Sequence, residues 1–90
     1  MQSTIHQAEG QLSCDVAGEF AVMNLKTGTH YGLDQIGARI WTLIQQPKTF
    51  EQIRDTIVAE YDVDVARCEA DLLALLRKLK AEGLIETREG

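Results

Sequence analysis

Residues 19–33 read EFAVMNLKTGTHYGL, and this stretch decides the fold because it holds two strand-like runs around a turn signal. The first run, residues 19–25, is apolar at almost every position, as is typical of a strand that is covered on both faces. Residues 26–28 (KTG) predict a hairpin turn, in which Gly28 can take a positive φ. Residues 29–33 (THYGL) then predict the returning antiparallel strand.

The register of this hairpin follows from the length of its turn. With a turn at residues 26–28, we expect Met23 opposite Tyr31 and Ala21 opposite Leu33, so that these four side chains share one face. Val22 would then point to the other face of the sheet.

A further strand precedes the hairpin. In residues 11–16, Leu12, Cys14 and Val16 alternate with polar residues, which is the period of a strand. A meander of the three strands places residues 29–33 at an edge. Natural edge strands usually carry Lys, Pro or a bulge that prevents further pairing. Because THYGL carries neither Lys nor Pro, the open edge predicts a binding partner.

Helical signals follow the hairpin. Asp34 is a good N-cap residue, and the apolar stripe behind it begins with Ile36 and Ile40. We expect Trp41, beside this stripe, to lie in the core. Pro47 ends this helical region.

Two more helices are predicted after Pro47. Thr49 and Gln52 have the spacing of a capping box. Asp64 can cap a third helix over residues 64–82, and Gly83 suits the position after its end. The third helix has an apolar arc made of Val65, Cys68, Leu72, Leu75, Leu76 and Leu79. The predicted fold is therefore α+β, a three-stranded antiparallel sheet followed by three helices.

The length of the chain allows a single domain, because 90 residues can enclose only one core. Residues 1–10 are polar with a single Ile, and we expect them to form a flexible N-terminal tail. The folded domain is predicted to span residues 11–86, and residues 87–90 to form a C-terminal tail.

The charge of the chain disfavours nucleic acid and anionic membranes as partners. There are 14 acidic and 9 basic residues, a net charge of −5, whereas phosphate binding depends on Lys and Arg. The predicted third helix has a mixed surface, with Arg67 and Lys78 beside Glu69 and Asp71. No apolar stretch approaches the roughly 20 residues of a membrane span, and residues 1–10 lack the pattern of a signal peptide. We expect a soluble, cytoplasmic protein.

Signals for catalysis or metal binding are missing. The sequence has no nucleophile elbow, no glycine-rich phosphate loop and no zinc-protease motif. Cys14 and Cys68 are interpreted as packed, reduced thiols; a dyad of either with His30 is a less favoured alternative. His6 and His30 are isolated from other potential ligands. We therefore expect no catalytic residue, no metal and no cofactor.

Three stretches, in this order and spacing, resemble one family. They are LKTGTHYGLDQIGARIW at residues 25–41, TFEQIRDTIVAEYDVD at 49–64 and CEADLLALLRKLKAEGLIE at 68–86. The chain resembles the PqqD-like proteins, also called RiPP recognition elements, which serve enzymes that modify ribosomally made peptides. The YGLD segment is most similar to the stand-alone leader-binding proteins of lasso-peptide pathways.

The resemblance implies a fold and a function. The fold is a winged helix-turn-helix with the sheet ahead of the helices. The function is noncatalytic: the leader of a precursor peptide adds a strand beside residues 29–33 and lies against the third helix. The domain then presents the precursor to a leader peptidase or another modifying enzyme, which for lasso peptides is a leader protease followed by a cyclase.

The resemblance also implies a set of peptide-binding residues. The edge strand would contribute Thr29, His30, Tyr31, Gly32 and Leu33, and the helix Asp71, Leu72, Leu75, Leu76, Lys78 and Leu79. Val22 would lie at the bottom of the binding pocket. The four leucines on the helix are equally good core positions.

Other functions stay open at this point. One alternative is a peptide chaperone of the PQQ pathway, and another is a small winged-helix DNA-binding regulator. The open edge also allows a weak or swapped homodimer.

Overall fold

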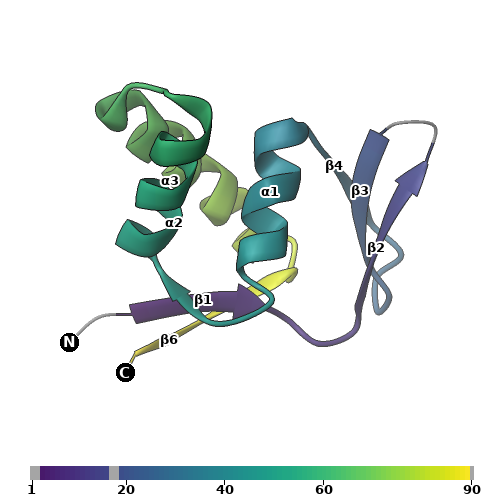
Figure 1. Cartoon of the computed structure of the whole chain (residues 1–90). Helices are drawn as coiled ribbons and strands as arrows, with labels where there is room; N and C mark the ends of the chain where they lie inside the picture. Colours follow the sequence, from purple (N-terminus) through teal and green to yellow (C-terminus); the bar gives the residue numbers. More distant parts are fainter. Residues whose placement is uncertain (1–2, 17–18, 90) are drawn as a thin grey trace.

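The computed structural model describes residues 3–16 and 19–89 (Figure 1). In this part of the chain, four strands come first, three helices follow with a short strand between the first two, and one more strand follows the last helix. The elements in chain order are β1 (Ser3–Gln7), β2 (Gln11–Val16), β3 (Glu19–Asn24), β4 (His30–Leu33), α1 (Gln35–Leu43), β5 (Lys48–Thr49), α2 (Phe50–Tyr61), α3 (Val65–Ala81) and β6 (Ile85–Glu89). The α+β prediction, with antiparallel strands and three helices, is confirmed. The winged helix-turn-helix label stays an interpretation of the α2–α3 pair.

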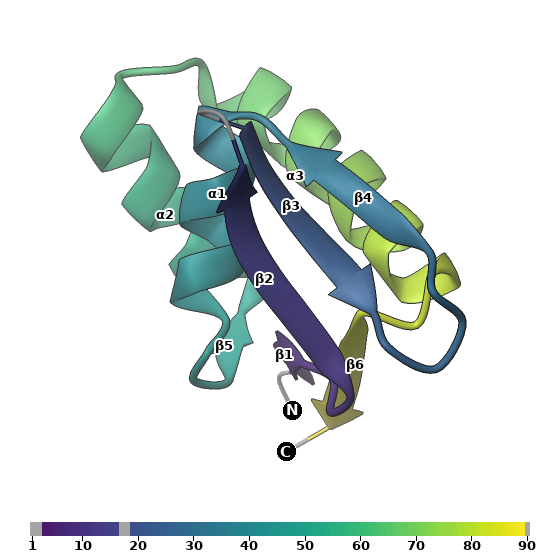
Figure 2. The same cartoon turned by 90° about the vertical axis from the view of Figure 1, so that its right-hand side faces the viewer.

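The predicted meander is present as a sheet with strand order β2-β3-β4. One face of this sheet packs on the helices, and the other has no helix in front of it (Figure 2). β4 pairs only with β3 among the described strands, so it lies at an edge as predicted.

The predicted register of the β3–β4 hairpin is wrong by one residue. Val22 lies opposite Tyr31, and Phe20 lies opposite Leu33. Tyr31 and Leu33 therefore share the helix-facing side with Val22, while Met23 points to the other face.

The shift goes with a longer turn, which begins after Asn24 and in which Asn24 makes three hydrogen bonds. Its main-chain N–H donates to the carbonyl of Thr29 at 2.8 Å, and its carbonyl accepts from the N–H of Gly28 at 2.8 Å. Its side-chain oxygen accepts from the N–H of Lys26 at 2.9 Å. The turn thus comprises residues 25–28, one residue more than the sequence pattern predicted.

A second sheet, with strand order β5-β1-β6, was not predicted. The expected flexible tail at residues 1–10 is wrong for residues 3–7, which form β1 and bury Ile5. Residues 87–89 likewise belong to β6 and not to a free C-terminal tail. β1 and β6 lie side by side, with Ser3 opposite Glu89. Residues 1, 2 and 90 lie outside the described chain.

The helix ends agree with the predicted caps. The side chain of Asp34 accepts from the N–H of Gly37 at 2.7 Å, and that of Asp64 accepts from Arg67 at 3.0 Å. Thr49 and Gln52 form the reciprocal capping box. Gly83 has a φ of 72°, with which it ends α3.

The core lies between the helices and the two sheets. Its most enclosed side chains are Trp41, Ile44, Ile53, Ile57, Leu72, Leu79, Leu84 and Val22. The expected core position of Trp41 is confirmed, since 2% of its surface is exposed. None of the helices in the described part of the chain has the length and hydropathy that a membrane span requires.

Candidate functional site

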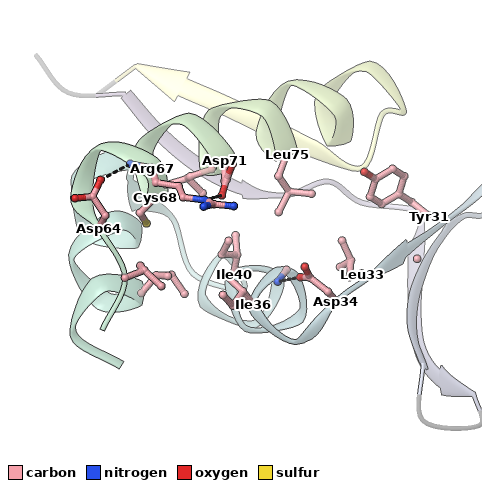
Figure 3. A pocket seen from close by; sticks show the side chains of 15 residues that line it. Tyr31, Leu33, Asp34, Ile36, Ile40, Asp64, Arg67, Cys68, Asp71 and Leu75 are labelled. Carbon is pink, nitrogen blue, oxygen red and sulfur yellow. Dashed lines mark hydrogen bonds and ion pairs between the residues drawn. The ribbon is translucent and has the colours of Figure 1, made fainter. Parts of the chain in front are cut away.

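A cavity of about 820 Å³ opens between β4, α1 and α3 (Figure 3). Its walls are Tyr31, Gly32, Leu33 and Asp34 on one side, Ile36, Gly37 and Ile40 from α1, Ile57, Val63 and Asp64 near the α2–α3 link, and Arg67, Cys68, Asp71, Leu72 and Leu75 from α3. In the close view, Leu75 points from α3 toward the side where Ile40 and Leu33 lie. The cavity therefore runs along the predicted edge strand and the predicted binding helix.

The interior of the cavity is apolar, and its charges lie at the rim. The carboxylates of Asp34 and Asp64 are engaged as helix N-caps. Arg67 and Asp71 form a 3.8 Å ion pair whose side chains are 83% and 76% exposed, so both remain available to a ligand. An apolar cavity with a few polar groups at its rim suits a hydrophobic or aromatic side chain that carries a polar end.

Gly37 lets α1 approach β4 closely. A Cβ at this position would lie 3.2 Å from Cδ2 of Leu33 and 3.1 Å from Oδ1 of Asp34. Such contacts are tighter than most real Cβ contacts, so Leu33 and Asp34 would have to give way by a few tenths of an ångström to admit another residue. The glycine thus sets the floor of the cavity close behind the edge strand.

The outer edge of β4 carries unpaired main-chain groups. Because Asn24 donates to Thr29 across the turn, the alternation of an antiparallel ladder directs the N–H and C=O of Tyr31 and Leu33 toward β3. The same groups of His30 and Gly32 point away from β3. Within residues 3–16 and 19–89, no main-chain hydrogen bond reaches this outer edge.

Six of the predicted binding residues line the cavity. These are Tyr31, Gly32, Leu33, Asp71, Leu72 and Leu75. Lys78 lies at the rim, with its Nζ 6.0 Å from the centre of the Tyr31 ring. Thr29 and His30 are exposed beyond the cavity.

Three predicted binding residues lie in the core and do not line the cavity. Val22 and Leu79 have no exposed surface, and Leu76 is 7% exposed. Leu76 and Leu79 face the packed interior because the apolar arc of α3 is wider than the cavity wall, and its inner part is covered by the rest of the core. Val22 faces the same interior from the helix-facing side of β3. The structure thus assigns Leu72 and Leu75 to the cavity wall, and Leu76 and Leu79 to the core.

The sequence prediction missed the end of the cavity near the α2–α3 link. Arg67 and Cys68 contribute to this end together with Val63 and Ile36. Cys68 was recognised as part of the apolar arc and as a packed thiol, but not as a residue of a cavity wall. Burial raises the pKa of its thiol, and the negative charge of Asp71 raises it further, so the group stays protonated and apolar at neutral pH.

The structure does not assemble a cysteine–histidine pair. Cys14 lies on β2 and His30 on β4, with β3 between them. Cys68 lies on the other side of the sheet, in the cavity. Among the described residues, no group of three or more His, Cys, Asp or Glu side chains is placed to hold a metal ion.

Comparison with known proteins identifies relatives of this arrangement. The sequence model of the PqqD family, described as coenzyme PQQ synthesis protein D, matches residues 19–85. None of the curated protein sequences compared with the chain matches it.

Three solved structures share the fold. TbiB1 in complex with the TbiA(beta) leader peptide is 40% identical, with a TM-score of 0.79 over 90% of this chain and 94% of TbiB1. Lasso peptide synthetase B1, complexed with its leader peptide, is 17% identical, with a TM-score of 0.79 over 91% of this chain and 96% of that one. The PqqD part of Methylobacterium extorquens PqqCD, a stand-alone RiPP recognition element, is 21% identical, with a TM-score of 0.76 over 92% and 88% of the two chains.

Proposed function

The chain belongs to the PqqD family, and we propose that it binds the leader segment of a ribosomally made precursor peptide and presents it to a processing enzyme of a lasso-peptide pathway. The observation that carries this proposal is the position of the open β4 edge, which forms one wall of the apolar cavity. The complex of the 40% identical TbiB1 with a leader peptide supports it.

The leader docks by strand addition. An extended peptide beside β4 pairs with the outward N–H and C=O groups of His30 and Gly32. Its side chains alternate between the two faces of the extended sheet, so every second one points into the cavity. Strand pairing supplies orientation that depends little on the leader sequence, and the cavity supplies selectivity.

The cavity provides most of the binding free energy. Ordering a flexible leader costs roughly 1–2 kcal/mol of backbone entropy for each fixed residue. Strand hydrogen bonds contribute only about 0.5–1.5 kcal/mol each, so the burial of an apolar anchor must offset the rest of this entropy cost. We propose that one or two hydrophobic or aromatic leader residues insert against Leu75 and Leu72, with Asp71 and Lys78 near their polar ends.

The domain itself breaks no bond in this proposal. It holds the precursor while a separate leader peptidase or modifying enzyme acts on it. The leader-binding domain includes β1 and β6, since these strands complete the core. The two free cysteines fit a reducing compartment, and we place this step in the cytoplasm.

The sharpest test of strand addition removes one main-chain donor. Gly32→Pro deletes the N–H that points away from β3, and an edge strand tolerates proline at such a position. Gly32→Ala is the matched control, because it keeps the N–H and its Cβ meets nothing within 4 Å. The probe is the fluorescently labelled TbiA(beta) leader peptide, which the 40% identical TbiB1 binds.

We expect Gly32→Pro to weaken leader binding by about tenfold, the equivalent of one hydrogen bond, and Gly32→Ala to bind like the unmodified chain. Fluorescence anisotropy measures the affinity, and circular dichroism verifies the fold. A folded proline variant with unchanged affinity contradicts docking at this edge.

A further inference from the structure

The outer edge of β6 is a second open strand edge of the molecule. β6 pairs with β1 on one side, and no described strand pairs with it on the other. It belongs to a different sheet from β4 and lies apart from it (Figure 1). The proposed leader-binding function makes no use of this edge.

The hydrogen-bonding pattern decides which main-chain groups of β6 are free. The N–H of Ala8 donates to the carbonyl of Leu84 at 3.0 Å, and β1 and β6 continue in the same register. The alternation of an antiparallel ladder then directs the N–H and C=O of Glu86 and Arg88 toward β1. The residues that direct these groups outward are Ile85, Thr87 and Glu89. Within residues 3–16 and 19–89, no main-chain hydrogen bond reaches them from this side.

The side chains of β6 carry opposite charges two residues apart. Glu86 and Arg88 share the side of the sheet that points away from the core, since Ile85 between β1 and α3 is buried on the other side. The Glu86 side chain is 59% exposed, and its Oε2 lies 3.2 Å from Nε2 of His6. Arg88 is exposed and forms no ion pair with a described residue. One acidic and one basic side chain are thus accessible beside the open edge.

A second copy of β6 complements this edge in one antiparallel register. With a two-fold axis at Thr87, Ile85 lies opposite Glu89 of the second copy, and all the outward main-chain groups are paired. Glu86 then lies opposite Arg88 of the second copy, twice in the dimer, at the positions where side chains of a ladder are closest.

The charges also exclude the neighbouring registers. The two other two-fold registers that pair outward groups have their axes at Glu86 and at Arg88. They place Glu86 opposite Glu86, or Arg88 opposite Arg88. Like charges directly opposite each other destabilise a strand pair, whereas opposite charges stabilise it. The charge order of β6 therefore selects the register centred at Thr87.

A hollow of about 500 Å³ beside β6 suits an acidic side chain of the second copy. Its lining consists of His6, Lys80, Ile85, Glu86, Thr87 and Arg88, of which three carry basic side chains. Nζ of Lys80 lies 3.1 Å from Oγ1 of Thr87. In the register centred at Thr87, Glu89 of the second copy comes to lie beside Ile85, on the side of the strand where Lys80 lies.

We propose that β6 pairs with β6 of a second copy of the chain and joins the two three-stranded sheets into one sheet of six strands. The contact is isologous and closes at two copies, because β5, at each far end of the joined sheet, has only two residues. A single short strand and a net charge of −5 on each copy make the dimer weak, so it forms at high protein concentration.

The dimer leaves both β4 edges open. If each copy binds a leader as proposed above, the dimer presents two precursors at once. This consequence rests on the proposed leader-binding function, whereas the pairing of the two β6 strands does not.

Charge reversal tests the contact. Arg88→Glu places two acidic side chains opposite each other, and Glu86→Arg two basic ones, while the double substitution restores opposite pairs. Lys26→Glu is the matched control, because it changes the net charge as Arg88→Glu does, at an exposed position of the turn after β3. Sedimentation velocity from about 10 μM to about 1 mM measures dimerisation, and circular dichroism verifies the fold.

We expect the unmodified chain and Lys26→Glu to dimerise with a Kd of about 1 mM or tighter. Each single reversal in β6 should weaken the dimer at least about tenfold, and the double reversal should recover most of this loss. An unmodified chain that stays monomeric at about 1 mM overturns the proposal. So does a folded double variant that stays as weak as the single ones.

A second arm identifies the edge. Thr87→Pro deletes an outward N–H of β6, and Gly32→Pro deletes the corresponding N–H of β4. We expect only Thr87→Pro to weaken the dimer. The opposite result would assign the contact to the β4 edge and overturn the proposal. Anisotropy with the labelled TbiA(beta) leader is measured in parallel, so a chain that dimerises through β6 and binds no leader refutes the leader function alone.

Discussion

The side-chain amide of Asn24 donates a 3.0 Å hydrogen bond to the main-chain carbonyl of Glu82, the C-cap residue of α3. Asn24 is 9% exposed and ends β3, so this bond ties the sheet to the end of the helix. β4 and α3 are two walls of the cavity. The bond therefore helps to set the separation of the walls between which the leader is proposed to lie.

Asn24→Ala should lower both stability and leader affinity. The substitution leaves the carbonyl of Glu82 and the N–H of Lys26 without their partner, and one such loss in a buried setting costs about 1–3 kcal/mol. Urea denaturation measures the free energy of unfolding. Lys26→Ala, at an exposed position of the same turn whose side chain makes no hydrogen bond or ion pair among the described residues, should change it by less than about 0.5 kcal/mol. If the two variants had the same free energy of unfolding, the hydrogen bond between Asn24 and Glu82 would contribute nothing to stability.

The cavity prediction is tested on two neighbouring leucines of α3. Leu75→Asp puts a carboxylate into the apolar cavity and should weaken leader binding by at least about tenfold, because an apolar anchor loses its contact. Leu73→Asp changes an exposed leucine outside the cavity and should leave affinity unchanged. Anisotropy with labelled leader measures both. The same substitution at Leu76 should instead unfold the domain, since this side chain is 7% exposed.

Gly83 and Gly28 should differ in their tolerance of alanine. Both have positive φ values, 72° and 75°, and alanine in this region costs roughly 1–2 kcal/mol. A Cβ on Gly83 would also lie 3.1 Å from Nδ2 of Asn24, whereas one on Gly28 meets nothing within 4 Å. Gly83→Ala should therefore lower the melting temperature more than Gly28→Ala in thermal denaturation. The reverse order would contradict the packing of Gly83 against Asn24.

The ion pair between Arg39 and Glu60 should make the free energy of unfolding depend on pH. Arg39 donates two 2.8 Å hydrogen bonds to Glu60, and these hold the pKa of the carboxyl below its ordinary value of 4.5. A lowered folded-state pKa means that the stabilisation is present above pH 4.5 and is lost as the pH falls through the folded pKa.

Arg39→Gln removes the pair, so its melting temperature should lie below that of the unmodified chain at pH 7 and approach it at pH 3. Arg77→Gln is the control, because Arg77 is an exposed arginine with no ion pair among the described residues. A difference for Arg39→Gln that does not change between the two pH values would exclude this pair as its cause.

The helices were predictable because their signals are local. Asp34, Thr49 and Asp64 each cap the helix that directly follows them, and a side chain three positions from an N–H needs no distant partner. β1 was missed for the opposite reason. Its pairing joins Ser3 to Glu89, and its sequence contains a single buried side chain, Ile5.

The site was predictable in outline and not in detail. The open edge followed from strand order, but the register depends on the length of the turn, which the sequence pattern gave one residue too short. The apolar arc of α3 identified its buried surface, yet a helical period does not tell a cavity wall from a core contact. Leu75 and Leu76 are adjacent in sequence and have different roles for this reason.

The shortness of β4 has a consequence for colloidal behaviour. The strand has four residues, of which only two, His30 and Gly32, direct main-chain groups outward. Short edges are one way in which natural sheets resist fibril growth, since too few bonds form to template the next molecule. The domain can thus keep this strand edge open for a peptide without using it to grow fibrils at high protein concentration.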